Sequence, residues 1–474
     1  MSRSDSSADD QSMELGETTG QLAGYLADLT YDDLPQEAVE LEKRHLLDTL
    51  GCILYGTTTP WVRKVVDALE ANEETGHGSV SVPTTGIKLP PARAALVNGT
   101  ASHSMDYDDY CQDAGVHAGS AIVPATLSYV QSTDRTVSGK DAITALTGGV
   151  EVAVRSGYGI GRGSLFDGWH IAGWTDAFGG AATAGLLMGL DREKMAHSLA
   201  LAGTQGAGLM GAAYGAEVKR FHMGKAAESG YLGAMLAEQS FTGDTKIFTE
   251  RWGGIGQTMS DDYDIPAVTE GLGDTYEFLS KLTFKPFPSV GQTHPPATAI
   301  RLIVEENGLD TDKITNVRVR VTETAKEKAG WDFEPEGVMS AQGNMQYAIG
   351  TYLVDGEIRI DAYTEEAIRR PAVLKRIENI EIIPDPDLVA DDASFNSRYK
   401  TTVEADTVDG STYSATVSQP PGFPENPMSD EELIEKFTEQ AEYVLDDEDI
   451  DAIVNFVLNV EDQDDFAELF EYLD

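Results

Sequence analysis

Apolar residues recur every three to four positions from Pro35 to about Phe241. This spacing is typical of helices that bury one face, so it predicts a helical fold for the first half of the chain. Pro35 is predicted to open the first helix, with Val39 and Leu46 on its buried face. A short hairpin is expected over residues 79–89. Further helices are predicted to begin near Trp61, Pro90, Ile122, Gly139, Thr175, Asp191 and His222.

The spacing changes to two residues in the third quarter of the chain. Val317, Val319 and Val321 alternate with arginines, which is the pattern of a half-buried strand. The Asp409-Gly410 pair between two apolar runs is a strong signal for a hairpin. The sequence therefore predicts an α+β segment here. Its predicted elements are strands at 317–321, 380–382, 399–408 and 411–417 and helices at 294–306 and 340–354.

Four prolines between positions 420 and 427 separate this segment from a last helical stripe, for which Ser429 is the predicted N-cap. From Glu425 to Asp474 the chain carries 19 acidic residues and one lysine, which we interpret as a solvated outer face. The apolar stripe consists of Leu433, Phe437, Val444, Ile450, Ile453, Val457 and Leu469. The predicted organisation is a mobile tail over residues 1–20, a helical part over 21–275, an α+β part over 276–420 and terminal helices over 421–474.

The net charge of −46, from 34 basic and 80 acidic residues, disfavours nucleic acids and anionic membranes as partners. Nucleic acids and anionic membranes need a cationic face, so neither is expected to bind. The acidity extends along the whole chain and only 16 residues are lysines. This favours a cytoplasmic protein of an extreme halophile. In molar salt the Debye length falls to about 3 Å, so the mutual repulsion of the acidic groups is largely screened. The alternative is an acidic protein of an ordinary cell. Cys52 and Cys111 make no disulfide framework, and no signal peptide or membrane span is expected.

The common cofactor motifs are absent from the sequence. The glycines between positions 157 and 163 do not fit G-x-G-x-x-G, and no Walker loop, G-x-S-x-G, HExxH or paired CxxC is present. Asp106, Asp108 and Asp109 lie close to His103 and resemble a calcium or magnesium loop, but the spacing is not that of an EF-hand. We therefore predict no organic cofactor and no metal.

The histidines are the main candidates for catalytic residues. Each of them alone is more often a hydrogen-bonded core residue than a catalyst. Lys219 and Lys285 lie in the same kind of tract in a chain that has few lysines. Five of the eight histidines lie in tracts rich in small or aromatic residues, namely His103, His117, His170, His222 and His294.

Seven segments resemble the MmgE/PrpD family, which includes 2-methylcitrate dehydratase, cis-aconitate decarboxylase and iminodisuccinate epimerase. They are LLDTLGC (46–52), NGTASHSMDYDD (98–109), GWHIAG (168–173), FGGAATAGLLMGLD (178–191), VKRFHMGKAAESG (218–230), KPFPSVGQTHP (285–295) and MQYAIGTYLVDGE (345–357). The resemblance extends in order over about residues 20–470. It implies a mainly α fold with an α+β insertion: a large all-helical domain, completed by the C-terminal helices, and a smaller α+β lid domain. It also implies an active site between the two domains, a homodimer, and no metal or organic cofactor.

The same resemblance assigns the candidate site residues. Asp106 matches the first acid of a D-x-D-D motif, His117 the histidine of an H-P-S/G loop, His170 that of G-W-H, Lys219 the lysine of K-x-x-H-x-G, and Lys285 the lysine of a lid-side K-P motif. These five are the predicted catalytic residues. His103, Tyr110, His222 and His294 are the predicted substrate-binding residues.

Three positions depart from the family pattern. Ala118 replaces a proline, Tyr110 stands where decarboxylase-like members carry threonine, and Val290 stands where cysteine or, in decarboxylase-like members, histidine is usual. The loss of a polar group at 290 disfavours the decarboxylase. We therefore expect a cofactor-independent lyase that dehydrates 2-methylcitrate to 2-methyl-cis-aconitate in propionate metabolism. The alternatives are an epimerase or isomerase of a dicarboxylate such as iminodisuccinate, a cis-aconitate decarboxylase, a non-catalytic carboxylate-binding protein, and a metal-dependent hydrolase.

The residue types suit this chemistry. Removal of a proton beside a carboxylate creates negative charge, which Lys219 and Lys285 would stabilise while holding the carboxylates of a small polycarboxylate substrate. His117 and His170 would be the base and the acid, in an order that the sequence leaves open. Asp106 would orient one imidazole.

The charge balance leads to a prediction about salt. A tricarboxylate has to approach a chain of charge −46, and dissolved salt screens this repulsion. We expect the activity to rise with KCl concentration into the molar range, as measured by initial rates on the purified protein. Highest activity at low salt, with the far-UV circular dichroism unchanged, would contradict the halophilic interpretation.

Overall fold

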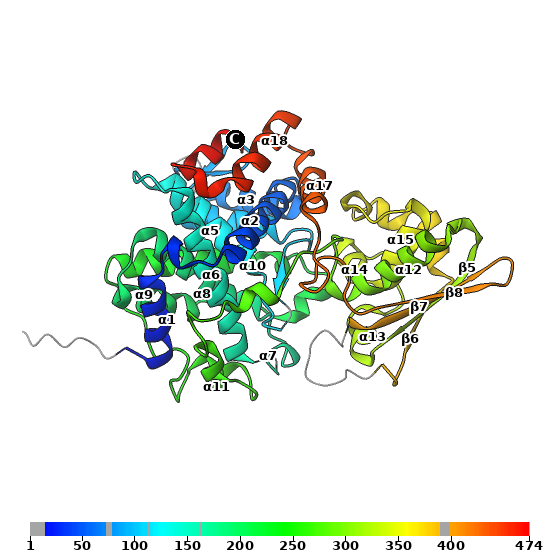
Figure 1. Cartoon of the computed structure of the whole chain (residues 1–474), viewed down its shortest axis with the longest axis horizontal. Coiled ribbons are helices and arrows are strands. Elements are labelled where there is room, and N and C mark those ends of the chain that lie inside the picture. The colour runs from blue at the N-terminus through cyan, green and yellow to red at the C-terminus, as the bar shows by residue number, and fades with distance from the viewer. Residues whose placement is uncertain (1–14, 73–77, 112, 162, 389–398, 474) are drawn as a thin grey trace, which may run out of the picture.

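The computed structural model describes residues 15–72, 78–111, 113–161, 163–388 and 399–473. It shows a helical body and, beside it, a smaller body built on a sheet (Figure 1), so the mainly α fold with an α+β part is confirmed. The helices of the helical body are α1 Glu17–Asp28, α2 Gln36–Gly56, α3 Pro60–Ala71, α4 Pro91–Ser102, α5 Gly119–Ser132, α6 Gly139–Ile160, α7 Gly163–Phe166, α8 Ala172–Met188, α9 Arg192–Gly203, α10 Val218–Glu238, α11 Ile255–Met259, α17 Asp430–Ala441 and α18 Asp447–Leu458. Its strands are β1 Val80–Val82, β2 Ile87–Leu89, β3 Tyr110–Cys111 and β4 Leu282–Thr283, and β1 and β2 form the expected hairpin.

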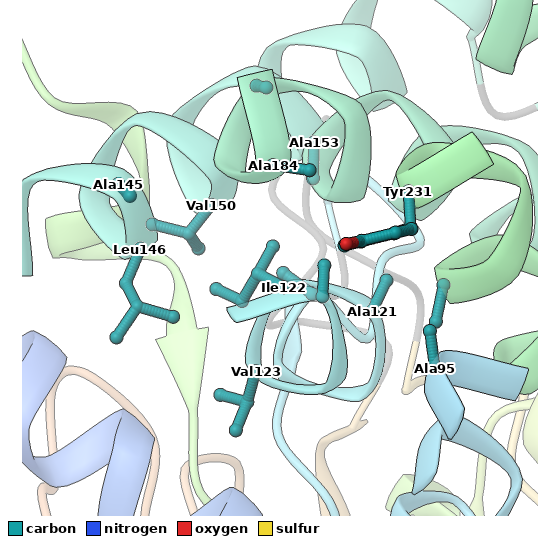
Figure 2. Close-up of a cluster of buried hydrophobic side chains, with 14 of the residues drawn as sticks. Ala95, Ala121, Ile122, Val123, Ala145, Leu146, Val150, Ala153, Ala184 and Tyr231 are labelled. Atoms are coloured by element: carbon teal, nitrogen blue, oxygen red, sulfur yellow. The ribbon is translucent and has the colours of Figure 1, made fainter. Parts of the chain in front are cut away.

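The core of the helical body surrounds α5. Figure 2 shows Ala121 and Ile122 of α5 with Leu146 and Val150 of α6 and Tyr231 of α10 around them. A helix that is apolar on all sides has to be enclosed by other helices. This explains why the central helices α5 and α8 are rich in alanine and glycine rather than amphipathic. None of the helices in the described ranges has the length and apolar character needed to cross a bilayer.

The C-terminal helices pack on the helical body. Leu433 and Phe437 of α17 and Ile453 and Val457 of α18 are buried in the same core as α2. Figure 1 shows α17 and α18, in red, beside α2 and α3, in blue. The two ends of the described chain therefore share one core, with the sheet body inserted between them in sequence.

The smaller body, called the lid below, has a four-stranded sheet in the order β6-β5-β7-β8. The β5 and β6 strands are parallel, and the other neighbours are antiparallel. Gly410, at φ +85°, makes the predicted turn between β7 and β8. Helix α12 contacts β7 and β8, and α15 contacts β6. The bounds are β5 Ile314–Val321, β6 Ile380–Pro384, β7 Thr401–Thr407, β8 Thr412–Val417, α12 His294–Asn307, α13 Glu323–Ala329, α14 Val338–Gln342, α15 Met345–Asp355 and α16 Pro371–Ile377.

Two predicted boundaries are wrong. The predicted tail over residues 1–20 ends too late, because α1 begins at Glu17 and the side chain of Thr19 is buried; residues 1–14 lie outside the described ranges. The single helix predicted over 340–354 is two helices, α14 and α15. They separate at Gly343 because Asn344 caps α15, its side chain accepting the Tyr347 N–H at 3.0 Å.

The lid begins later than residue 276. Phe278, Leu282 and Phe284 are buried in the core of the helical body, and Phe287 is the first residue beyond them in the lid core. The transition therefore lies between Phe284 and Phe287. Lys285 lies at this junction, so the two bodies meet at a candidate catalytic residue.

The crossing of α8 and α10 supports a prediction about stability. The helices approach at Gly180 and Gly230, where a Cβ on Gly230 would lie 2.7 Å from the Ala181 nitrogen, whereas one on Gly180 would meet its nearest atom at an ordinary 3.5 Å. We expect Gly230→Ala to destabilise the protein by about 1–3 kcal/mol in urea unfolding. The control Gly180→Ala should be neutral or stabilising, because alanine favours helix. Equal stability of the two variants would contradict this packing.

Candidate active site

The loop of residues 103–109, called the acidic loop below, lies between α4 and β3. Asp106 in this loop has φ +54°, a left-handed conformation that costs about 1–3 kcal/mol for a residue with a side chain. Side chains from separate parts of the fold bind the loop's carbonyl oxygens and hold this geometry. The bonds run from Arg220 Nε to Ser104 (2.7 Å), Gln342 Nε2 to Met105 (2.6 Å), Lys285 Nζ to Asp106 (2.8 Å), Lys436 Nζ to Tyr107 (2.7 Å) and His117 Nδ1 to Asp109 (2.8 Å).

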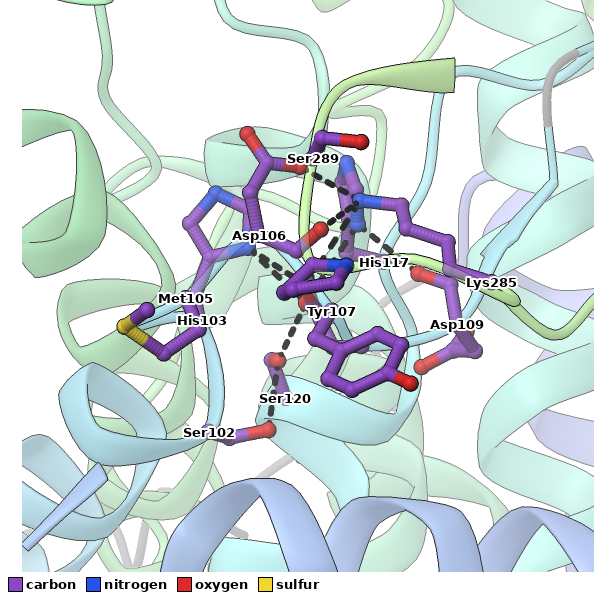
Figure 3. Close-up of polar contacts among 12 residues, drawn as sticks. Ser102, His103, Met105, Asp106, Tyr107, Asp109, His117, Ser120, Lys285 and Ser289 are labelled. Carbon is purple, nitrogen blue, oxygen red and sulfur yellow. Dashed lines mark hydrogen bonds and ion pairs between the residues drawn. The ribbon is translucent and has the colours of Figure 1, made fainter. Parts of the chain in front are cut away.

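Two buried ammonium groups share the carboxylate of Asp106 (Figure 3 shows the Lys285 side). Lys219 Nζ lies 2.7 Å from Oδ2, and Lys285 Nζ bonds Oδ1. Burial alone would raise the pKa of Asp106, but the two lysines outweigh it and hold this pKa well below its usual value. Burial lowers the pKa of Lys219, although the carboxylate of Asp106 acts in the opposite direction and raises it. Burial also acts on Lys285, but Asp106 and Asp108 outweigh it and raise its pKa.

His103 is bonded to this cluster through both of its ring nitrogens. Its Nδ1 lies 2.8 Å from Asp108 Oδ2, and its Nε2 lies 2.9 Å from Lys219 Nζ. An ionised carboxylate only accepts, so Nδ1 carries the ring proton and Nε2 accepts from the ammonium group. Burial lowers the pKa of His103 to about 3, which keeps the imidazole neutral. Ser120 donates to the same Asp108 at 2.7 Å.

His117 has a defined tautomer as well. Its Nδ1 lies 2.8 Å from the Asp109 carbonyl oxygen and 3.3 Å from Asp108 Oδ2. Both atoms are acceptors, so Nδ1 carries a proton, and in the neutral form of the ring Nε2 is the basic nitrogen. The backbone N–H of His117 donates to Asp176 Oδ2 at 3.0 Å, which fixes the segment that carries the ring.

His170 pairs with His222 through their Nδ1 atoms, which lie 3.0 Å apart. In such a pair one nitrogen donates and the other accepts. Burial lowers the pKa of His170 well below its ordinary value, with Lys219 as the next cause, and burial lowers the pKa of His222. The rings of His117 and His170 are 6.4 Å apart between centroids, so two imidazoles lie within reach of one small molecule.

These groups line a cavity of about 180 Å³. Six predicted residues lie on its wall, namely Asp106, Tyr110, His117, His170, Lys219 and Lys285. Val290, one of the positions that depart from the family pattern, lies there too, with Met210, Gln292, Lys328 and Tyr399. The cavity therefore contains both the charged groups and the side chains that limit what fits beside them.

Three predicted substrate-binding residues do not line this cavity. His103 lies beneath Lys219, and His222 lies behind His170. His294 is fully buried, and its Nε2 lies 3.1 Å from the Ser289 carbonyl oxygen. His103 and His222 therefore contact residues of the cavity wall from behind, and His294 is bonded to a backbone carbonyl group.

Sequence reasoning missed the residues that hold the site in place. Asp108 was considered only as a metal ligand, although it binds two histidines and Ser120. Gln342 and Asp176 were not singled out, because each acts through a backbone group of a distant segment. The one available signal was Lys436, the single lysine in the acidic C-terminal segment.

His103, His117 and His170 offer nitrogen atoms within 4.8 Å of one another, which is the spacing of a possible metal site. Both ring nitrogens of His103 are already bonded, however, to Asp108 and to the ammonium group of Lys219. A cation at this point would face the Lys219 charge directly. The three histidines therefore fit a site in which a lysine takes the place of a metal ion.

Comparisons with known proteins agree with this architecture. Residues 20–266 match the MmgE/PrpD N-terminal domain, and residues 287–462 match the MmgE/PrpD C-terminal domain. The cis-aconitate decarboxylase of Aspergillus terreus (strain NIH 2624 / FGSC A1156) is 29% identical over 479 residues, which cover 96% of this chain and 95% of that protein. Those of Homo sapiens and Mus musculus are 29% and 26% identical, over 96% and 97% of this chain and 94% of each relative. The two domain matches follow one another along most of the sequence, and the chain belongs to the MmgE/PrpD family.

Proposed function

We propose that this protein is a cofactor-independent lyase for a small tricarboxylate, and that its reaction is the dehydration of 2-methylcitrate to 2-methyl-cis-aconitate. The observation that carries the proposal is one cavity with two ammonium groups on a shared carboxylate and two imidazoles beside them. The names of the curated relatives, which are lyases of a tricarboxylate, support the class of reaction.

The ammonium groups supply the anion-binding part of the site. An ammonium group has three N–H donors. Among the described residues, Lys219 uses two of them on Asp106 and His103, and Lys285 uses two on the side chain and carbonyl of Asp106. Each lysine thus has one donor for a substrate oxygen. Because both are buried, their attraction for a carboxylate is stronger than at an exposed surface.

The imidazoles supply the proton transfers. His117 Nε2 takes a proton from a carbon beside a carboxylate, and the C–H electron pair forms the new C=C bond as the C–O bond breaks. As His170 Nε2 gives its proton to the departing hydroxyl group, which leaves as water, His170 takes a proton at Nδ1 from the Nδ1 of His222, which lies 3.0 Å away. His222 is only partly buried and takes a replacement proton from solvent at its Nε2, so neither ring is left as an anion. The lysines stabilise the negative charge that develops on the carboxylate.

Val290 supports dehydration over decarboxylation. It lines the cavity with Tyr110, and it supplies no proton donor where decarboxylase-like members carry a histidine. Decarboxylation of cis-aconitate is the second candidate, because the curated relatives bear that name over nearly the full length of the chain. Both reactions act on a tricarboxylate. Dehydration breaks a C–O bond, whereas decarboxylation breaks a C–C bond.

A substrate panel tests the proposal. We expect 2-methylcitrate, at molar KCl, to give a new ultraviolet absorbance from a conjugated C=C bond, without release of CO₂. Release of CO₂ from cis-aconitate as the faster reaction would establish the second candidate instead. Deuterium uptake from heavy water into a dicarboxylate whose bonds are otherwise unchanged would establish an epimerase. Turnover of none of these acids would refute the proposed class.

Variants of one lysine and one histidine test the roles assigned to these residues. We expect Lys219→Ala and His170→Gln each to lower kcat by about 100-fold or more on the true substrate, because each removes a charge-stabilising or proton-donating group. Lys225→Ala on the same helix and His197→Gln, a buried histidine bonded to the Gly243 carbonyl, are the matched controls and should keep kcat. Near-normal kcat in either test variant removes that residue from the mechanism.

A further inference from the structure

The single lysine of the acidic C-terminal segment is buried. From Glu425 to Asp474 the chain has 19 acidic residues and one basic residue, Lys436 on α17. The side chain of Lys436 is only 2% exposed. A lysine is rarely enclosed unless it has specific partners, so its position inside the helical body requires an explanation.

The partners of Lys436 lie on α2 and in the acidic loop. Its Nζ is 2.5 Å from Asp48 Oδ1 and 2.7 Å from the Tyr107 carbonyl oxygen. It also lies over the Tyr107 ring, 4.1 Å from the centroid. Asp48 supplies the counter-charge, and Tyr107 supplies the contact with the acidic loop.

The Tyr107 carbonyl group belongs to the peptide that joins Tyr107 to Asp108, so the bond from Lys436 fixes the acidic loop on the C-terminal side of the strained Asp106. Asp106 has to keep φ at +54° to present one carboxylate oxygen to Lys219 and the other to Lys285. If this peptide were free to rotate, the loop would lose its anchor on that side of Asp106, and the alignment of the Asp106 carboxylate between the two lysines would loosen.

We propose that Lys436 is a positioning residue, which holds the Tyr107 carbonyl group so that Asp106 keeps the conformation that aligns Lys219 and Lys285. The C-terminal helix α17 is by this inference a part of the active-site machinery, although it contributes nothing to the described cavity wall. The inference rests on the proposed function for its activity measurement.

The test separates positioning from simple stability. Lys436→Met alone would leave Asp48 as a buried unpaired carboxylate and would destabilise the fold. The test variant is therefore Lys436→Met with Asp48→Asn, which removes both charges. We expect kcat to fall by about 100-fold, the effect of misplacing a catalytic group by about 1 Å, with a smaller change in KM and a thermal midpoint near that of the native protein.

Two controls isolate the Tyr107 contact. Asp48→Asn alone leaves Lys436 without its counter-charge and should lower the thermal midpoint, but it keeps the bond from Lys436 to the Tyr107 carbonyl group, so the folded variant should keep kcat. Arg155→Met with Glu151→Gln removes a second buried ion pair, whose arginine likewise donates to loop carbonyl groups, at Glu270 and Thr275. That pair lies outside the candidate site, so this variant should lose stability and keep kcat.

A folded Lys436→Met/Asp48→Asn variant with native kcat would overturn the inference. If this variant does not fold, Lys436→Gln/Asp48→Asn is compared with Asp48→Asn, because glutamine keeps an N–H donor but is one atom shorter than lysine. A lower kcat of the folded double variant than of folded Asp48→Asn supports the positioning role, and an equal kcat overturns it. If the native protein turns over no acid in the panel, the proposed function fails instead.

Discussion

The sharing of Asp106 by Lys219 and Lys285 is the interaction on which the rest of the site depends. Three charged groups are buried together, and none of them would stay ionised there alone, because removal of a charge from water costs several kcal/mol. The lysines also come from different parts of the chain, one from α10 and the other from the junction with the lid. The ion cluster thus joins the two bodies at the point where the substrate is expected to bind.

Backbone carbonyl oxygens are the second constraint. Five residues of the acidic loop have their carbonyl groups bound by side chains from four other regions of the fold and from His117. Such bonds are individually modest, but together they hold a left-handed aspartate that would not persist in an isolated loop. The lid takes part through Gln342 and the C-terminal helices through Lys436, so the loop's shape depends on the whole chain.

The sequence allowed the helices to be predicted well because their apolar period is regular, and the hairpin at Asp409-Gly410 because its turn requires a positive φ. The break at Gly343 was missed because a cap such as Asn344 has no periodicity of its own. The five catalytic candidates came from resemblance to a family, and all five line one cavity. The anchors Gln342 and Asp176 could not be predicted, since a side chain that binds a distant backbone group leaves no local pattern. The halophilic origin, the cytoplasmic location and the homodimer stay predictions of the sequence.

The anchored floor of the cavity has a consequence for how this architecture diversifies. Its walls are tied together beneath Asp106 by side chains of both bodies, so the floor has little freedom to adapt to ligands of different size. Tyr110, Met210 and Val290 lie on the wall and, among the hydrogen bonds described for the acidic loop, hold none of its carbonyl groups. Substitutions at these three positions can therefore change which ligand fits without disturbing the loop that holds Asp106. New specificities can evolve in this way while the residues that transfer protons stay the same.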